Sequence, residues 1–116
     1  MPFSISLSGL RAARIGMDLA ADNTANLLSR GFKKSRAVNL SGPSPGSGVR
    51  TIVQRIETPG YPGPPDPAPG APRELSNVDL AEEMVSLIVS ERTFQANLQT
   101  LRSEDEMLGN LIDILA

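Results

Sequence analysis

Apolar side chains recur at alternating steps of four and three residues through the C-terminal third of this chain. This spacing predicts a stripe along one face of a single helix that runs from about residue 77 to residue 115. Such a helix would extend roughly 58 Å at about 1.5 Å per residue, and it cannot bury the stripe against itself. We therefore expect the stripe to pack against other helices. Its predicted packing positions are Leu80, Met84, Leu87, Phe94, Leu98, Leu101, Leu108, Ile112 and Leu115.

Two acidic residues, Glu91 and Asp105, occupy positions of the same stripe. A polar group in a helix seam lowers stability but can fix the register of the helix pair. We expect both carboxylates to form ion pairs with an arginine of a partner helix, and the candidates are Arg11, Arg14 and Arg30.

A second, narrower stripe predicts an amphipathic helix at the N-terminal end of the chain. Gly31 suits the left-handed C′ position that would end this helix, with Phe32 and Leu27 in contact as in a Schellman cap. Gly9 and Gly16 share one face, where they either let another backbone approach closely or simply weaken the helix. The predicted packing positions are Phe3, Leu7, Leu10, Met17 and Leu27.

Residues 37–75 hold nine of the ten prolines and six of the ten glycines, which predicts a spacer between the two helices. Alternating apolar residues at 49–56 predict one β-strand, paired with residues near 37–40 in a short hairpin. A lone hairpin is marginal in water and needs a partner surface. The predicted fold class is mainly α, with N-terminal (1–36) and C-terminal (76–116) helices in an antiparallel coiled-coil hairpin around this Pro/Gly-rich middle.

The start of the C-terminal helix is marked by Ser76 or Asn77 as the N-cap, followed by acidic residues in the first turn. Asp79 and Glu83 also share a face at i, i+4, a spacing that a metal or acid–base site could use. Because no histidine or second acidic element converges on them, the sequence favours a helix start over such a site.

The composition removes most catalytic chemistry. The chain has no cysteine, histidine or tryptophan, so disulfides, zinc sites of the Cys/His kind and Cys- or His-based nucleophilic catalysis are excluded. An enzyme built on carboxylates and Tyr61 is the alternative, but Tyr61 lies among prolines, far in sequence from any acidic pair. We therefore expect no enzyme, no cofactor and no bound metal.

Charge is divided between the two ends, with a net +4 on residues 1–36 and −6 on residues 76–116, so the ends attract each other. The basic cluster of Arg30, Lys33 and Lys34 follows the predicted first helix, where it complements the helix dipole. It lacks stacking aromatics, so we expect no nucleic-acid binding. No apolar run approaches the roughly 20 residues of a membrane span, and a cleaved signal peptide is not evident, so we expect a soluble chain without membrane insertion.

Two motifs at opposite ends of the chain resemble those of bacterial flagellar rod and hook proteins. Residues 21–33 resemble the signature A-x-N-I-A-N-x-x-T-x-G-F-K, although Thr24 stands in place of its Ile and Ser29 in place of its Thr. The residues that match are Asn23, Ala25, Asn26, Gly31 and Phe32. Residues 77–97 resemble N-V-D-L…E-M-V…R-x-Y/F-Q-A-N, and the residues that match include Asn77, Asp79, Glu83, Met84, Arg92, Gln95, Ala96 and Asn97.

The resemblance implies a structural subunit of the basal-body rod, most like the proximal-rod members of the family. It implies terminal helices that pack as a coiled coil in the wall of a hollow tube, with self-association in a helical assembly. The implied partners are other rod and axial proteins and the flagellar export apparatus. The implied location is the rod in the periplasmic space, reached without a cleaved signal peptide. The alternative is a helical-hairpin adaptor or export chaperone of the flagellar or type III system.

Overall fold

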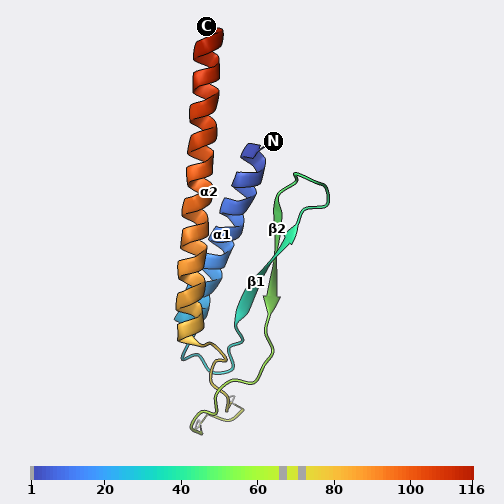
Figure 1. The fold of residues 1–116 in the computed structure, drawn as a ribbon. Coiled ribbons are helices and arrows are strands. Elements are labelled where there is room, and N and C mark those ends of the chain that lie inside the picture. The colour runs from blue at the N-terminus through green and yellow to red at the C-terminus, as the bar shows by residue number, and fades with distance from the viewer. Residues whose placement is uncertain (1, 66–67, 71–72) are drawn as a thin grey trace.

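Two helices and one β-hairpin make up the computed structural model, which describes residues 2–65, 68–70 and 73–116. In chain order they are α1 (Pro2–Ala25), β1 (Ser35–Ser41), β2 (Val49–Arg55) and α2 (Leu80–Leu115). The helices lie side by side and run in opposite directions, and the hairpin lies along α1 (Figure 1). The prediction of a mainly α chain with a short hairpin in its middle is confirmed. Coiled-coil geometry of the helix pair stays a prediction.

The molecule is a rod of 75 × 25 × 19 Å. Its radius of gyration is 20.0 Å, whereas a compact domain of this length would have roughly 13 Å. Ser6, near the start of α1, lies beside Glu104 and donates to its Oε1 at 3.5 Å. Residues 105–115 of α2 therefore project beyond α1 (Figure 1).

Small residues of α1 form its contact with α2. Ala12, Ala13 and Ala20 are buried. A Cβ on Gly16 would lie 2.5 Å from Ser90 Oγ, and a Cβ on Gly9 would lie 2.7 Å from Asn97 Cγ. The two glycines thus permit close approach of α2, which decides between the two interpretations of their spacing.

The α2 residues at this contact repeat every seven positions. Ser90 and Asn97 oppose the two glycines, Glu83 is buried one heptad earlier, and Glu104 follows one heptad later beside Ser6. A seven-residue repeat keeps the same face of a helix turned to its neighbour. The face of α2 that α1 covers therefore carries a polar row.

The start of α2 differs from the expectation that Ser76 or Asn77 caps it. Asp79 is the N-cap, with its backbone in an extended conformation and its side chain accepting from Ala81 N at 2.9 Å and Glu82 N at 3.4 Å. Ser76 Oγ accepts instead from Val78 N at 3.1 Å. The predicted cap was wrong because these earlier side chains are used in the segment that leads into the helix.

The end of α1 also differs from expectation, because the helix stops at Ala25. Gly31 has the predicted positive φ of 70°, but its N–H donates to Glu74 O at 3.0 Å, and Phe32 N donates to Ser29 O at 3.3 Å. No Schellman cap with Leu27 forms within this described segment. Gly31 instead turns the chain at a contact with the segment that precedes α2.

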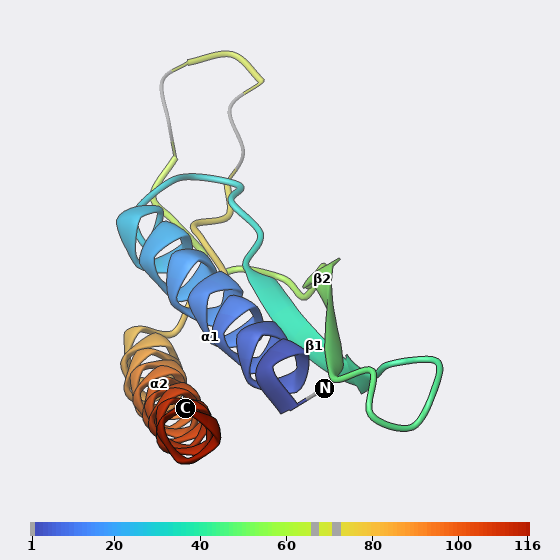
Figure 2. The ribbon, with the colours of Figure 1, turned by 90° about the horizontal axis from the view of Figure 1, so that it is seen from above.

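The hairpin rests on α1, which supplies the partner surface that it needs. Its strands are antiparallel with Ala37 opposite Val53, and Gly42 N donates to Gly48 O at 2.8 Å to close the turn. Val49 N donates to Ser8 Oγ of α1 at 2.9 Å. In the described segments α1 contacts α2 and both strands, whereas α2 contacts neither strand. α1 is thus the central element, with α2 and the hairpin on different sides of it (Figure 2).

We predict that Gly16→Val forces the two helices apart, because the new side chain would lie against Ser90 at their closest approach. Overpacking of this kind costs about 1–3 kcal/mol. The helical circular dichroism signal of the purified full chain should therefore be lost at a lower temperature than in the parent chain.

Gly109→Val is the matched control, because Gly109 likewise lies within a helix, here α2, but a Cβ there meets nothing within 4 Å. Valine favours a helix more than glycine does, so this variant should melt no lower than the parent. Equal melting temperatures for the two variants would contradict the close packing.

Candidate functional site

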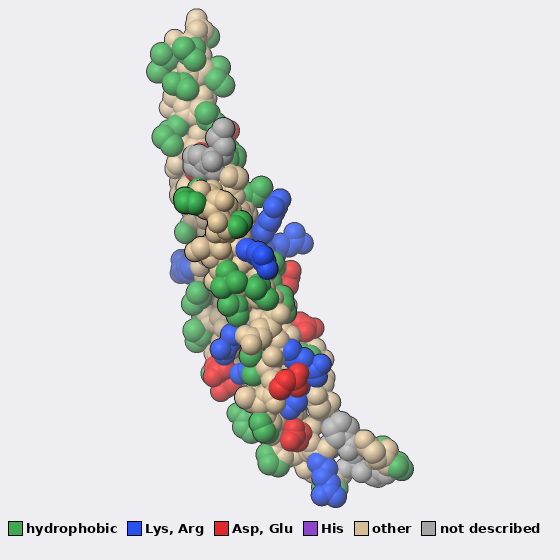
Figure 3. Space-filling model, turned by 90° about the vertical axis from the view of Figure 1, so that its right-hand side faces the viewer, with side chains coloured by type: hydrophobic (Ala, Val, Ile, Leu, Met, Phe, Trp, Pro, Cys, Tyr) green, Lys and Arg blue, Asp and Glu red, His purple; other side chains and the backbone are tan. Residues whose placement is uncertain are grey.

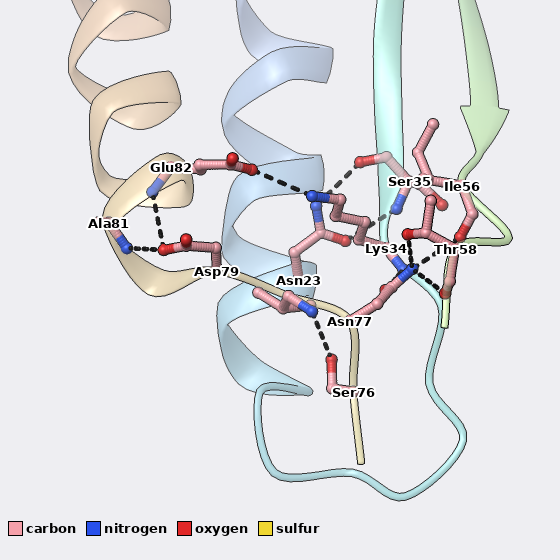
Figure 4. Close-up of polar contacts among 11 residues, drawn as sticks. Asn23, Lys34, Ser35, Ile56, Thr58, Ser76, Asn77, Asp79, Ala81 and Glu82 are labelled. Carbon is pink, nitrogen blue, oxygen red and sulfur yellow. Dashed lines mark hydrogen bonds and ion pairs between the residues drawn. The ribbon is translucent and has the colours of Figure 1, made fainter. Parts of the chain in front are cut away.

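Two buried asparagines hold together the base of the molecule, where both helices and the hairpin meet (Figure 4). Asn23, in the last turns of α1, is 1% exposed. Its Nδ2 donates to Ser35 O at 2.9 Å, and its Oδ1 accepts from Ser35 N at 3.1 Å. The side chain thus pairs with the first residue of β1 as a neighbouring strand would, and it ties α1 to the hairpin.

Asn77 makes the corresponding link from the segment before α2. Its Oδ1 accepts from Lys34 N at 2.7 Å, and its Nδ2 donates to Ile56 O at 2.9 Å and to Thr58 O at 3.1 Å (Figure 4). The buried side chain therefore uses both its donor and its acceptor. We call Asn23, Asn77 and the backbone groups that they bind the asparagine node.

Two ion pairs surround the node. Lys33 Nζ lies 3.2 Å from Glu74 Oε2, and Lys34 Nζ lies 3.0 Å from Glu82 Oε2 in the first turn of α2. The pKa of Glu74 lies below its ordinary value of 4.5, chiefly because Lys33 donates a hydrogen bond to the carboxylate. The hydrogen bond from Gly60 N and then the charge of Lys33 lower it further. The basic cluster was expected at the end of α1, but α1 ends earlier. Lys34 instead binds the first turn of α2, and Lys33 binds the segment that precedes it.

The other residues of the two motifs fall into three groups. Gly31 and Asp79 shape the path of the chain. Gly31 turns it with a positive φ, and Asp79 is the N-cap of α2. Glu83 and Asn97 belong to the polar row that α1 covers. The remaining ones are exposed or half-buried. Of these, Phe32 belongs to the asparagine node through its backbone, because its O accepts from Asn77 N at 3.4 Å. The others lie outside the node: Ala25, Asn26, Met84, Arg92, Gln95 and Ala96.

The predicted packing positions are divided by the structure. A half-buried group lies along the helix pair: Leu10, Met17, Leu27, Phe94, Leu98 and Leu101. An exposed group has no cover in the single chain: Phe3, Leu7, Leu80, Met84, Leu87, Leu108, Ile112 and Leu115. The stripe read from the sequence is therefore largely open, which leaves it available to another molecule.

Glu91 and Asp105 make no ion pair with Arg11 or Arg14 among the residues that the structure describes. Glu91 Oε1 accepts from Gln95 Nε2 at 3.2 Å, one turn along its own helix. Arg14 Nε lies 4.0 Å from Asp18 Oδ2, again along its own helix. Pairing of the two carboxylates with arginines of a partner helix stays a prediction.

Further exposed apolar residues lie on α2 beside the predicted stripe, including Val85, Ile88, Val89, Leu111 and Ile114. A single-stripe interpretation missed them, because it assigned one face of the helix to packing and the rest to solvent. The signal was present in the near-continuous apolar run at 84–89 and in the last residues of the helix. The surface available for assembly is thus wider than one seam.

Within residues 2–65, 68–70 and 73–116, no group of three or more acidic residues is arranged to hold a metal ion. No helix in this part of the chain is long and apolar enough to cross a membrane. What the arrangement offers is a braced helix pair with an uncovered apolar surface.

Comparisons with known proteins match the part of the chain that contains α2. Residues 74–114 match the family described as flagellar basal body rod FlgEFG protein C-terminal. Over 41 residues the chain is 44% identical to the flagellar hook protein FlgE of Escherichia coli (strain K12), which covers 35% of this chain and 10% of that protein. Over 36 residues it is 47% identical to the flagellar basal-body rod protein FlgG of Borreliella burgdorferi, 31% of this chain and 14% of that protein.

The match thus spans only a small share of these relatives' length and coincides with α2 and the segment that leads into it. It supports the flagellar rod and hook family for this part of the chain, and it does not single out the proximal-rod members. Proteins of the hook and rod are structural components and not enzymes. Residues 74–114 of this chain therefore resemble the C-terminal part of flagellar hook and rod proteins.

We predict that Asn77→Asp loosens the asparagine node by about 1–3 kcal/mol, because a carboxylate cannot donate to the carbonyl oxygens of Ile56 and Thr58. Amide hydrogen exchange at Ile56, whose N–H donates to Lys34 O at 2.9 Å, should accelerate. Asn39→Asp is the control, because Asn39 is exposed and its Oδ1 accepts from Thr51 Oγ1 at 2.9 Å, as a carboxylate can. Unchanged exchange in Asn77→Asp would contradict the role of the node.

A second prediction concerns pH. Because the pKa of Glu74 is lowered in the folded chain, its ion pair with Lys33 stabilises the fold above about pH 4.5. This stabilisation is lost as the pH falls through the lowered pKa. A nuclear magnetic resonance titration of the Glu74 carboxyl carbon should give a midpoint below 4.5 in the parent chain. The midpoint should rise in Lys33→Ala, and an unshifted midpoint there would contradict this ion pair.

Proposed function

We propose that this chain is a structural subunit of the bacterial flagellar rod, of the proximal-rod type, and that it polymerises through coiled-coil packing of its two helices with those of neighbouring subunits. The observation that carries this proposal is the contrast between α2 and the core. Large apolar side chains are exposed on α2 at 80–89 and 107–115. The buried hydrophobic residues of the described part of the chain are Ala12, Ala13, Ala20 and Val78.

The surface area of the chain supports assembly on physical grounds. The accessible surface is 8171 Å², whereas a folded monomer of 12.3 kDa would have about 6100 Å² by the usual scaling. The excess is on the order of 2000 Å², which is the area that stable protein interfaces bury. Exposed large apolar side chains that gather on one helix are typical of an interaction site.

The partners in this proposal are other rod and axial proteins, further copies of the chain and the flagellar export apparatus. The location in this proposal is the rod in the periplasmic space. The asparagine node serves this function by fixing the angle at which α2 leaves the base. A subunit whose helices splay apart would present its apolar surface in the wrong direction.

The experiment that tests this function is Leu108→Asp in the full chain. Leu108 lies on the projecting part of α2 and is exposed, so the charge should leave the fold intact, with an unchanged circular dichroism spectrum. A charge in a buried interface is strongly unfavourable, so the variant should be exported in normal amount yet be missing from purified basal bodies.

Asn110→Asp is the matched control, because Asn110 lies on the same projecting segment but on its polar side, and this variant should be incorporated. Normal incorporation of Leu108→Asp would contradict the proposal. A parent chain that is a stable soluble dimer and is missing from basal bodies would instead support the adaptor or chaperone.

A further inference from the structure

The segment that follows the hairpin carries a sequence repeat of three residues. Prolines stand at 59, 62 and 65, and glycines stand at 60 and 63. A proline fixes its own φ at about −65° and drives the residue before it into extended backbone. Polyproline II, an extended helix with three residues per turn, satisfies both limits.

The structure shows the same period of three. A Cβ on Gly60 would collide with Leu75 O. A Cβ on Gly63 would lie 3.1 Å from Leu75 Cδ2, and Gly63 N donates to Arg73 O at 2.8 Å. Both glycines therefore face the segment that precedes α2, whereas positions three apart in a β-strand face opposite sides. Neither glycine has a positive φ, as polyproline II requires.

Further hydrogen bonds brace this segment against the rest of the chain. Leu75 N donates to Tyr61 O at 2.8 Å, and Arg30 Nη1 donates to Pro64 O at 2.8 Å. A spacer between two helices has no need of such bonds. They hold the segment in one conformation before any partner arrives, which lowers the entropy cost of binding.

The two remaining faces of the segment are open to solvent. One carries Pro59, Pro62 and Pro65, and the other carries Tyr61 and Pro64. All five residues are exposed, Tyr61 at 60%. In the described part of the chain, no hydrogen bond reaches the carbonyl oxygens of Pro59 and Pro62. The segment is thus an apolar ridge with acceptors that a partner can use, and we call residues 58–65 the proline ridge.

The proline ridge lies at the base of the molecule (Figure 1). Thr58 joins it to the asparagine node, because Thr58 O accepts from Asn77 Nδ2 at 3.1 Å. Apolar side chains dominate the opposite end, which is the projecting part of α2 (Figure 3). A partner on the ridge would therefore leave the exposed surface of α2 open.

We propose that the proline ridge binds a second protein, through a groove that this partner lines with aromatic side chains. Such grooves recognise prolines three residues apart on a preformed polyproline II helix. Tyr61 adds an aromatic ring beside the prolines, and tyrosine is frequent among the residues that dominate binding energy. This surface is different from the one in the proposed function, and the inference does not depend on that function.

The first test uses purified SH3 and WW domains as probes, because their aromatic grooves contain tryptophan and bind proline-rich segments. The full chain has no tryptophan, so tryptophan fluorescence reports the groove of the probe alone. The parent chain should bind at least one probe domain, and Pro62→Ala should weaken that binding roughly tenfold. Pro45→Ala is the matched control, because Pro45 is exposed in the hairpin turn, and it should bind like the parent.

Pro62→Ala should leave the fold intact, because the hydrogen bonds around this position belong to Tyr61 O and Gly63 N. Equal circular dichroism melting curves for variant and parent check this. Tyr61→Ala keeps every proline and should also weaken binding roughly tenfold, so it decides the question if Pro62→Ala melts lower. The inference is overturned if no probe domain binds the parent chain, or if Tyr61→Ala binds as well as the parent.

Photo-cross-linking in cells tests for a natural partner. Benzoylphenylalanine in place of Tyr61 should form an adduct with another protein, and Pro62→Ala in the same chain should abolish that adduct. No adduct, an adduct that persists in Pro62→Ala, or an adduct only with a second copy of the chain would contradict the inference. Absence of the chain from basal bodies would contradict the proposed function alone.

Discussion

The close approach of α1 to α2 through small residues is the contact on which the rest of this structure depends. Gly9 and Gly16 bring the backbones together, and Ala12, Ala13 and Ala20 fill the space between the helices. Small side chains bury little apolar area, so this contact alone supplies limited stability. Because α1 offers mainly small side chains to α2, the large apolar side chains of α2 at 80–89 and 107–115 stay exposed.

The asparagine node compensates for this small core with directional contacts. Asn23 and Asn77 each satisfy backbone groups of the hairpin, and Lys34 joins the same region to the first turn of α2. Buried amides that use both donor and acceptor specify one geometry, because any other leaves polar groups unpaired. The base of the molecule is thus held by polar contacts, while its far end is an uncovered apolar helix.

The helices and the hairpin were predictable from the sequence, because apolar spacing reports which local structure a segment favours. The face of α2 that packs on α1 was not, because the apolar stripe at Leu80 and Met84 is stronger in the sequence than the row at Ser90 and Asn97 that packs on glycines. Periodicity does not reveal which face a small-residue neighbour selects. The motif residue Asn77 was recognised, but its bonds to Lys34 and Ile56 join segments distant in sequence, so only the fold discloses them.

The central claim is that the exposed surface of α2 becomes covered when the chain assembles into the flagellar rod. It is tested most directly by the reactivity of a single cysteine at Ile112 toward a maleimide, in the purified chain and in isolated basal bodies. Ile112 is exposed in the single chain, so the free Ile112→Cys protein should react fully. The cysteine should be protected in basal bodies that contain the variant, and equal reactivity in both preparations would contradict burial of α2 on assembly.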